Sequence, residues 1–393
     1  MQSKQGKIKK LLRESGINGA IVSSPENFHY IAGFSGHQHT VSRQAGFSFA
    51  LMGAGDNIKT TVATMDFEVP TFHIKNVNDL IVKGYDTWVG VRQWEEIAQG
   101  LDAAPQGVFQ SSMDVLIKTV KEYGLANKKI GIEMAYLPVE YFRILEEKLP
   151  EAEFVNVSDI FVYSRSVKTA EEIQLFEKLC AVADEGFFKV SQMVAVGVNE
   201  KELAACFREH VVASSGCIPS GWSMFSSGGN GARLTLPEDN VIKIGDVVKF
   251  DAGVNAEHDF YTTDTSRGWV MEGADPLIYK LKDRLYEAQR KMIEMAKPGV
   301  PINEIFRTGY EWVHAKYPSY RRGHLGHSIS LGPATAEAPY INATEKRPLE
   351  AGMILAMEVP CYILNKAGFN IEDMVLITEN GARILTPKTP HYL

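Results

Sequence analysis

Hydrophobic spacing divides the first part of the chain into alternating helices and strands. Apolar positions recur with helical spacing over residues 6–15, and the run 17–24 that follows is short, apolar and β-branched. Further strand-like runs and helical patterns alternate after it, the strands at 47–52, 60–65 and 129–134 and the helices at 92–101 and 111–124. Strands that alternate with helices predict an α/β layer domain over residues 1–163.

The pattern changes after residue 163. Thr169 followed by Glu171 and Glu172 predicts a helix start, because a threonine and an acid three positions later can cap the first turn reciprocally. Helical patterns then cover 200–215, 277–297 and 302–317, and strand pairs are expected at 246–254 with 259–271 and at 353–363 with 368–378. Helices separated from antiparallel strands predict an α+β domain over residues 164–393.

Composition narrows the possible functions. A chain of 393 residues exceeds one hydrophobic core, and 45% hydrophobic with 23% charged residues is typical of a soluble globular protein. The formal net charge of -7 argues against a nucleic-acid partner, and no apolar run is long enough for a membrane helix. The first residues lack the apolar core of a signal peptide. The four cysteines are scattered and are expected to be free thiols: Cys180, Cys206, Cys217 and Cys361. Both observations favour a cytoplasmic location.

Four acids and one histidine in the second domain carry the candidate chemistry. Asp264 lies on the strand that returns from Asp251, so a hairpin can place the two side by side, and Glu358 and Glu372 repeat this arrangement in the last hairpin. His327 adds the only nitrogen. Four carboxylates and an imidazole at one point repel one another unless cations neutralise them, so the set predicts a two-metal site and hydrolysis by a bridging hydroxide. An oxygen-rich ligand set suits Mn²⁺ best, with Fe, Co or Zn as alternatives.

The motifs around these residues resemble metallopeptidase family M24, which has the pita-bread fold and includes Xaa-Pro aminopeptidases, prolidases, methionine aminopeptidases and creatinases. The similar segments run through the whole length of the chain and lie at 24–36, 167–178, 227–253, 351–360 and 370–381. The resemblance implies a pita-bread catalytic domain preceded by a smaller α/β N-terminal domain. It also implies a homodimer and a small-molecule or short-peptide substrate.

The same resemblance implies a role for each ligand. Asp251 would hold one metal ion in bidentate fashion, and Asp264 and Glu372 would bridge both ions. His327 and Glu358 would hold the second ion, and Glu358 would also act as the general base that takes a proton from the bridging water. All five positions are filled in this sequence.

The sequence departs from the family's peptidases around this ligand set. Histidines are expected at three positions that here are Thr235, Gly323 and Ala336, and an arginine common in the proline-specific branch is replaced by Asn370. Loss of one oxyanion donor typically lowers the rate by about two to three orders of magnitude. The departures therefore argue against efficient hydrolysis of proline peptides through the usual contacts.

Several residues are candidates for the missing contacts. His324, beside Gly323, could replace the lost histidine, and a solvent-facing loop position is an equal alternative. Arg267 is expected to orient Asp264 from the second coordination shell, and Thr235 stands where a substrate contact is expected. Four further residues could bind a carboxylate of the substrate, although an ordinary surface position is favoured for each of them: Tyr261, His258, Arg321 and Arg322.

Three functions compete on this evidence. The favoured hypothesis is a metal-dependent hydrolase of a peptide or amide bond in a small substrate, similar to an Xaa-Pro dipeptidase or aminopeptidase. The alternative keeps the fold but changes the reaction, to a creatinase-like C–N hydrolase or a lyase of the dimethylsulfoniopropionate type, because the peptidase histidines are replaced. A catalytically silent binding protein is least favoured, since clustered acids are costly to retain without a metal.

Overall fold

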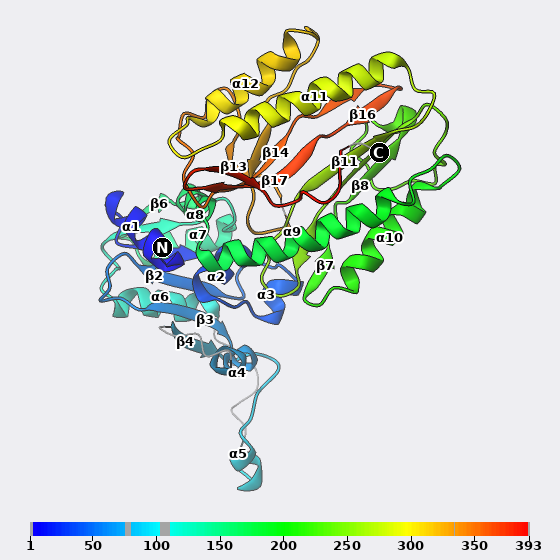
Figure 1. Cartoon of the computed structure of the whole chain (residues 1–393). Coiled ribbons are helices and arrows are strands. Elements are labelled where there is room, and N and C mark those ends of the chain that lie inside the picture. The colour runs from blue at the N-terminus through cyan, green and yellow to red at the C-terminus, as the bar shows by residue number, and fades with distance from the viewer. Residues whose placement is uncertain (1–2, 75–79, 103–110, 334, 392–393) are drawn as a thin grey trace. The chain divides into compact units, whose positions relative to one another are not determined.

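The chain divides between Ser164 and Arg165 into two compact units, each of which is described by itself (Figure 1). The computed structural model describes residues 3–74, 80–102, 111–333 and 335–391. Strands with helices between them make up the first unit, and a large antiparallel sheet with long helices makes up the second. This architecture confirms the predicted α+β fold class with an α/β N-terminal part.

The first unit is built on a six-stranded mixed sheet with the order β4-β3-β2-β1-β5-β6. Its strands are β1 (Gly19–Val22), β2 (Phe49–Gly53), β3 (Thr60–Met65), β4 (Leu80–Tyr85), β5 (Lys129–Ile132) and β6 (Glu153–Asn156). Its helices are α1 (Lys4–Glu14), α2 (Pro25–Ala32), α3 (His37–Val41), α4 (Val69–Ile74), α5 (Trp94–Ala98), α6 (Ser112–Glu122), α7 (Val139–Lys148) and α8 (Ser158–Ser166), with a 3-10 turn at Asp66–Glu68. The predicted strands near 17–24, 47–52, 60–65 and 129–134 are all present, with shifts of a few residues at their ends.

The second unit is built on an eight-stranded antiparallel sheet. Seven of its strands follow the order β13-β12-β14-β17-β11-β9-β8, and the eighth strand, β18, pairs with β17. These strands are β8 (Met224–Ser227), β9 (Val247–Ala252), β11 (Thr265–Val270), β12 (Gly326–Ser328), β13 (Glu337–Tyr340), β14 (Ile354–Glu358), β17 (Glu372–Thr378) and β18 (Gly381–Ile384). Two small pairs accompany the sheet, β7 (Cys217–Pro219) with β10 (Val254–Ala256) and β15 (Cys361–Ile363) with β16 (Ala367–Phe369).

The helices of the second unit begin where capping residues allow. They are α9 (Ala170–Ser191), α10 (Glu200–Val212), α11 (Pro276–Met295) and α12 (Ile302–His314), with a 3-10 turn at Gly228–Asn230. At the start of α9 the Thr169 N–H donates to Glu172 Oε2 at 2.7 Å, and the Glu172 N–H donates to Thr169 Oγ1 at 3.3 Å. This reciprocal cap satisfies two N–H groups that the first turn would leave without partners, and it confirms the predicted helix start.

One face of the large sheet packs against these helices (Figure 1). Phe250 of β9 contacts Phe187 of α9 and Phe207 of α10, with ring centroids 4.8 and 5.1 Å apart. On the same face Asp373 of β17 accepts a hydrogen bond from Gln289 of α11 at 3.2 Å. Because strand side chains alternate between faces, the neighbouring residues Asp251 and Glu372 point to the opposite face. That opposite face is the one on which the candidate site lies.

Among the residues that the structure describes, none of the helices is both long enough and apolar enough to span a membrane.

Candidate metal centre

The pairing register brings three of the predicted ligands into one row across the sheet. Asp251 of β9 is paired with Ser266 of β11, Ser266 with Glu372 of β17, and Glu372 with Glu358 of β14. Directly paired residues of antiparallel strands have their side chains on the same face, so these three carboxylates project together. Asp264 lies two positions before Ser266 and therefore projects from the same face.

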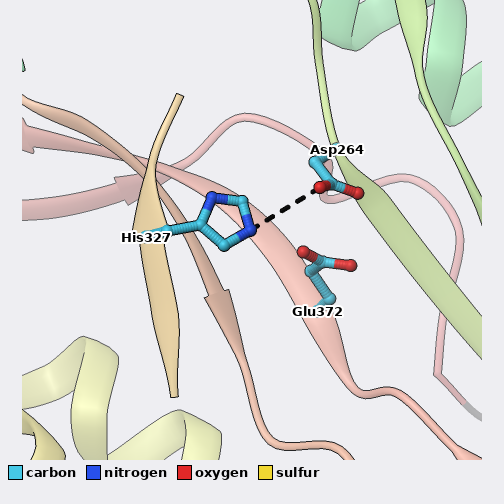
Figure 2. Close-up of side chains that lie close together, drawn as sticks. All are labelled: Asp264, His327 and Glu372. Atoms are coloured by element: carbon cyan, nitrogen blue, oxygen red, sulfur yellow. Dashed lines mark ion pairs between the residues drawn. The ribbon is translucent and has the colours of Figure 1, made fainter. Parts of the chain in front are cut away.

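His327 completes the cluster from the neighbouring strand β12. Its Nε2 lies 3.6 Å from Asp264 Oδ2, and the side chains of Asp264, His327 and Glu372 point toward one another (Figure 2). One ligand atom from each of these three residues lies within 4.8 Å of the others. The opposite ring nitrogen, Nδ1, is 3.0 Å from the carbonyl oxygen of Ser328. A proton on Nδ1 leaves the Nε2 lone pair directed at the carboxylates, as a metal-binding imidazole requires.

The electrostatics of the cluster favour the binding of cations. Burial, together with the negative charges of the neighbouring acids, raises the pKa of Asp264 and of Glu372 well above their ordinary values. Burial also raises the pKa of Asp251 to about 6, and among the residues that the structure describes none forms a hydrogen bond with the buried Asp251 Oδ1. Oxygen ligands with one imidazole are the donor set that divalent metal ions prefer, so the residues fit the predicted metal centre.

Glu358 differs from the other acids because cationic groups surround it. His324 Nδ1 lies 3.3 Å and Arg322 Nη2 lies 3.4 Å from Glu358 Oε1. Burial alone would raise the pKa of Glu358, but the hydrogen bond from His324 and the charge of Arg322 lower it below its ordinary value. Glu358 is therefore ionised and able to accept a proton, as a general base must be.

Two roles predicted for residues around the site do not agree with the structure. Arg267 was expected to orient Asp264, but it lies on the other face of the sheet because an odd number of positions separates the two residues. Its guanidinium is buried and donates to Asp373 Oδ1 at 2.9 Å and to the backbone oxygens of Glu372, Ser266, Thr386 and Thr389. Arg267 thus holds the start of β17 in place and is not available to a substrate.

Tyr261 is the second correction. Its side chain is 2% exposed, packs edge-to-face on Phe176 of α9, and donates its hydroxyl proton to Glu172 Oε1 at 2.6 Å. The phenol therefore joins the loop before β11 to the first turn of α9. This geometry makes Tyr261 part of the core and removes it from the candidates for substrate binding.

The remaining predicted contacts lie in loops. Thr235 is half-buried in the irregular segment between the 3-10 turn at Gly228–Asn230 and β9, and His258 is 79% exposed in the hairpin that links β10 to β11. Their roles toward a substrate stay predictions. A contact that the sequence reasoning missed is made by Thr335, whose hydroxyl lowers the pKa of Asp264 against the larger effect of burial. Nothing in the spacing of Thr335 marks it, because it approaches the site from a loop.

Comparisons with known proteins agree with this geometry. Residues 174–379 match the model of metallopeptidase family M24, and residues 5–167 match the creatinase/prolidase N-terminal domain. The chain belongs to metallopeptidase family M24. The match to the family model covers the four carboxylates and the histidine of the cluster. The Xaa-Pro dipeptidases and prolidases among the similar proteins favour the peptidase hypothesis over the creatinase-like or lyase alternative.

The chain is similar to known proteins over two thirds or more of its length. An Xaa-Pro dipeptidase of Pyrococcus furiosus is 26% identical over 389 residues, which are 98% of this chain and 98% of the relative. An Xaa-Pro dipeptidase of Pyrococcus horikoshii is 30% identical over 264 residues, 66% of this chain and 73% of the relative. The crystal structure of a prolidase from Pyrococcus horikoshii superposes with a TM-score of 0.76 at 24% identity and covers 98% of each chain. The second unit of this M24 chain therefore has the pita-bread fold, preceded by the smaller α/β domain.

Asn370 is the departure from the M24 pattern that the structure explains most directly. Its side-chain Nδ2 donates to Asp251 Oδ2 and to Glu372 Oε2, both at 3.1 Å, and the residue is 2% exposed. The amide thus joins two of the predicted metal ligands, Asp251 of β9 and Glu372 of β17. An arginine at this position would add a positive charge, whereas the neutral amide leaves the negative charge of the carboxylates for the metal ions.

We expect Asn370→Ala to weaken metal binding by about 10- to 100-fold, because groups that orient ligands typically contribute that much to affinity. A chelating dye that competes for Mn²⁺ measures the dissociation constant directly. Asn18→Ala is the matched control, since the exposed Asn18 side chain only accepts a hydrogen bond from the Lys129 N–H at 3.2 Å in the first unit. An unchanged dissociation constant for Asn370→Ala would contradict the orienting role.

The raised pKa values predict how pH affects the metal-free protein. Because burial raises the pKa of Asp251 from 3.8 to about 6 and raises those of Asp264 and Glu372, the folded state keeps protons that the unfolded state releases. Their contribution to stability is therefore complete below about pH 4 and is lost as the pH rises through 6 and beyond.

Thermal unfolding in chelator and in excess Mn²⁺, between about pH 5 and about pH 8, measures this effect. We expect the stabilisation by Mn²⁺ to widen as the pH rises, because bound cations neutralise the carboxylates that lose their protons. The control is Asp264→Asn. In this variant the unfolding temperatures measured in chelator and in Mn²⁺ should differ less across the pH range. Parallel curves for the unmodified protein would show that the acids do not bind protons as described.

Proposed function

We propose that this M24 chain is a metal-dependent peptidase that cleaves a peptide bond in a small substrate of the Xaa-Pro class. The observation that carries the proposal is the row of paired strand positions that places Asp251, Glu372 and Glu358 on one face beside Asp264 and His327. The Xaa-Pro dipeptidases among its relatives support the substrate class.

We propose two divalent metal ions as cofactors, with Mn²⁺ first and Fe, Co or Zn as alternatives. Asp251, Asp264, Glu372, His327 and Glu358 would hold them. Such ions, when bound, polarise a carbonyl group and make water a better nucleophile at neutral pH.

The chain's own residues would then move the proton. Glu358 accepts a proton from the attacking water and delivers it to the leaving nitrogen, since its low pKa keeps it ionised before the reaction. His324, whose Nδ1 lies 3.3 Å from Glu358, keeps the carboxylate in place. The His324 ring is about one-third exposed, at 35%, so it also reaches the solvent side where a substrate would enter.

We propose the same division for function as for structure, with residues 164–393 carrying the chemistry and residues 1–163 forming a separate N-terminal domain.

A homodimer is supported by the exposed apolar side chains between residues 88 and 101, of which Trp94 is 73% and Ile97 is 61% exposed. Apolar surface of this kind often marks a protein interface. Light scattering should then give twice the chain mass of 43.6 kDa.

A cytoplasmic location is supported by the free cysteines Cys180, Cys206, Cys217 and Cys361.

Release of free proline tests the proposed reaction. Mn²⁺-loaded protein is incubated with a panel of Xaa-Pro dipeptides and Xaa-Pro-Yaa tripeptides, and the free amino acids are quantified. We expect proline from the dipeptides. Protein that demonstrably holds metal but releases no amino acid from any member of the panel would refute the substrate class.

A further inference from the structure

Residues 385–391 run over the helix-covered face of the large sheet, opposite to the face that carries the candidate metal centre. The structure describes all of them as irregular, yet the side chains of Thr386, Thr389 and His391 are buried. Irregular segments normally lie on the surface, where water satisfies their polar groups. Buried polar side chains in this segment therefore indicate specific contacts with the sheet.

Several of these contacts meet at Asp373, which follows Glu372 on β17 and points to the opposite face. Asp373 is 2% exposed. The donors to its carboxylate are Arg267 Nη2 at 2.9 Å and Thr386 Oγ1 at 3.1 Å on Oδ1, and Gln289 Nε2 and His391 Nε2, both at 3.2 Å, on Oδ2. Arg290 of α11 adds a salt bridge to Oδ2. An ionised carboxylate has about four acceptor sites, so these donors leave it little freedom to rotate.

His391 makes its contact as a neutral donor. Burial, and then the charge of Arg267, lower the pKa of His391 to about 4, so the imidazole carries one proton at neutral pH. The buried Nδ1 forms no hydrogen bond with any residue in the described part of the chain, whereas Nε2 lies 3.2 Å from Asp373 Oδ2. The proton is therefore assigned to Nε2, which donates it to the carboxylate.

Thr389 links the same segment to the backbone of a predicted metal ligand. Its N–H donates to Asp184 Oδ1 of α9 at 2.9 Å, and its hydroxyl donates to the Asp184 carbonyl oxygen at 2.7 Å. The Thr389 carbonyl oxygen accepts from Arg267 Nε at 2.8 Å, and Arg267 Nη1 donates to the Glu372 carbonyl oxygen at 2.6 Å. A continuous series of hydrogen bonds thus runs from α9 through Thr389 and Arg267 to Glu372.

The pairing of β17 with its neighbours shows why such support matters. Toward β14 the pairing runs from Glu372 with Glu358 to Leu376 with Ile354. Toward β11 it consists, within the described residues, of Ser266 with Glu372. So short a ladder supplies few hydrogen bonds, and the contacts on the helix-covered face hold the start of β17 on this side instead.

We propose that the segment 385–391 is a positioning element of the metal centre, in which His391 and Thr389 fix the start of β17 from behind and thereby place Glu372. Groups at such a centre must be held within about 0.5 Å of their working geometry. His391 acts on Glu372 through Asp373 and touches neither metal ion nor substrate, so it is a positioning residue. The inference rests on the proposed two-metal centre and is independent of the substrate class.

Metal binding by full-length variants tests the proposal without any substrate. A competing chelating dye measures the Mn²⁺ dissociation constant, and the visible absorption of Co²⁺-loaded protein reports the coordination geometry. We expect His391→Ala to weaken Mn²⁺ binding by about tenfold, at the lower end of the effect of groups that orient ligands, and to change the Co²⁺ spectrum. His391→Gln, whose amide can still donate to Asp373, should bind Mn²⁺ as the unmodified protein does and restore the spectrum.

A milder variant keeps the test informative if His391→Ala does not fold. Thr386→Val removes one donor to Asp373 and nearly preserves the side-chain volume. Loss of one hydrogen bond should weaken Mn²⁺ binding by about two- to tenfold.

Two control variants separate positioning from general stability. Lys388→Ala changes an exposed side chain of the same segment, which pairs with Glu185 of α9 and not with β17. Val313→Ala removes buried apolar volume from α12, which carries none of the predicted ligands, and lowers the unfolding temperature in chelator. Both controls should keep the Mn²⁺ dissociation constant and the Co²⁺ spectrum of the unmodified protein.

Three results would overturn the proposal. The first is unchanged Mn²⁺ binding and an unchanged Co²⁺ spectrum in His391→Ala and Thr386→Val. The second is a His391→Gln variant as impaired as His391→Ala, and the third is an equal loss of metal binding in Val313→Ala. Weaker metal binding by His391→Ala of a protein that releases no proline would refute only the proposed reaction. Proline release by a protein whose metal binding ignores these changes would refute only the positioning role.

Discussion

Asp264→Ala should lose metal binding and peptidase activity together. Asp264 Oδ2 lies 3.6 Å from His327 Nε2, and Asp264 is within ligand reach of Glu372, so its loss would remove the ligand that is proposed to bridge both ions. Metal ions contribute several kcal/mol to such reactions, and about 1.4 kcal/mol corresponds to a factor of ten in rate. We therefore expect kcat/KM to fall by about three orders of magnitude or more, with metal content measured by mass spectrometry falling in parallel.

The same variant separates loss of function from loss of folding. In chelator Asp264→Ala should unfold at the same temperature as the unmodified protein or higher, because one of several mutually repelling acids is gone. Mn²⁺ at about 100 times its dissociation constant stabilises a protein by about 2.7 kcal/mol, or roughly 5–10 °C for a unit of this size. That gain should be absent in the variant and present in Asp239→Ala, which changes an exposed acid. A variant that keeps both metal and rate would refute the assignment of Asp264.

Glu358→Gln should retain the fold but lose most of the rate. Glutamine has nearly the same shape, yet it cannot accept a proton, and general base catalysis typically contributes about 10²- to 10⁴-fold. Steady-state kinetics at saturating Mn²⁺ should therefore show a fall in kcat of at least about 100-fold. The loss should appear in kcat even when KM changes, because proton transfer belongs to the transition state.

A pH profile adds a second readout for Glu358. Against the effect of burial, the hydrogen bond from His324 and the charge of Arg322 lower the pKa of Glu358, so the base should stay active at mildly acidic pH. Glu358→Gln should leave only a residual rate without that acidic limb. If kcat remained within about tenfold of the unmodified protein, another group would have to take the proton.

Local patterns predicted the elements that carry the site. The strands of the two hairpins, the cap at Thr169 and the long helices of the second unit follow from period-two and helical spacing, and all are present. Short strands such as β7, β12 and β13 were missed because segments of three or four residues have too little periodicity to recognise. In the first unit the four-residue strand β6 was missed for the same reason, and the six-residue strand β4 was also missed.

The candidate site was predictable where hairpin geometry places residues together and not where distant loops converge. The two hairpins placed Asp251 beside Asp264 and Glu358 beside Glu372 from the chain alone, and the register pairs Glu358 directly with Glu372. The pairing of Ser266 with Glu372, which joins the two hairpins into one row, could not be predicted in this way. The predicted contact of Arg267 with Asp264 was wrong. Strand alternation would have excluded it, because Arg267 follows Asp264 by an odd number of positions and therefore points to the other face. The contact of Asn370 with two ligands required the folded sheet, because Asp251 lies far from it in sequence.

Titration of metal-free protein with Mn²⁺, followed by the rate of proline release from an Xaa-Pro dipeptide, tests the central claim most directly. The account predicts no turnover without metal and a rate that rises with added Mn²⁺ until about two ions per chain are bound, as in a two-metal site. A rate that is independent of the metal, or full metal occupancy without any proline release, would contradict the claim that this cluster of acids is the centre of an Xaa-Pro peptidase.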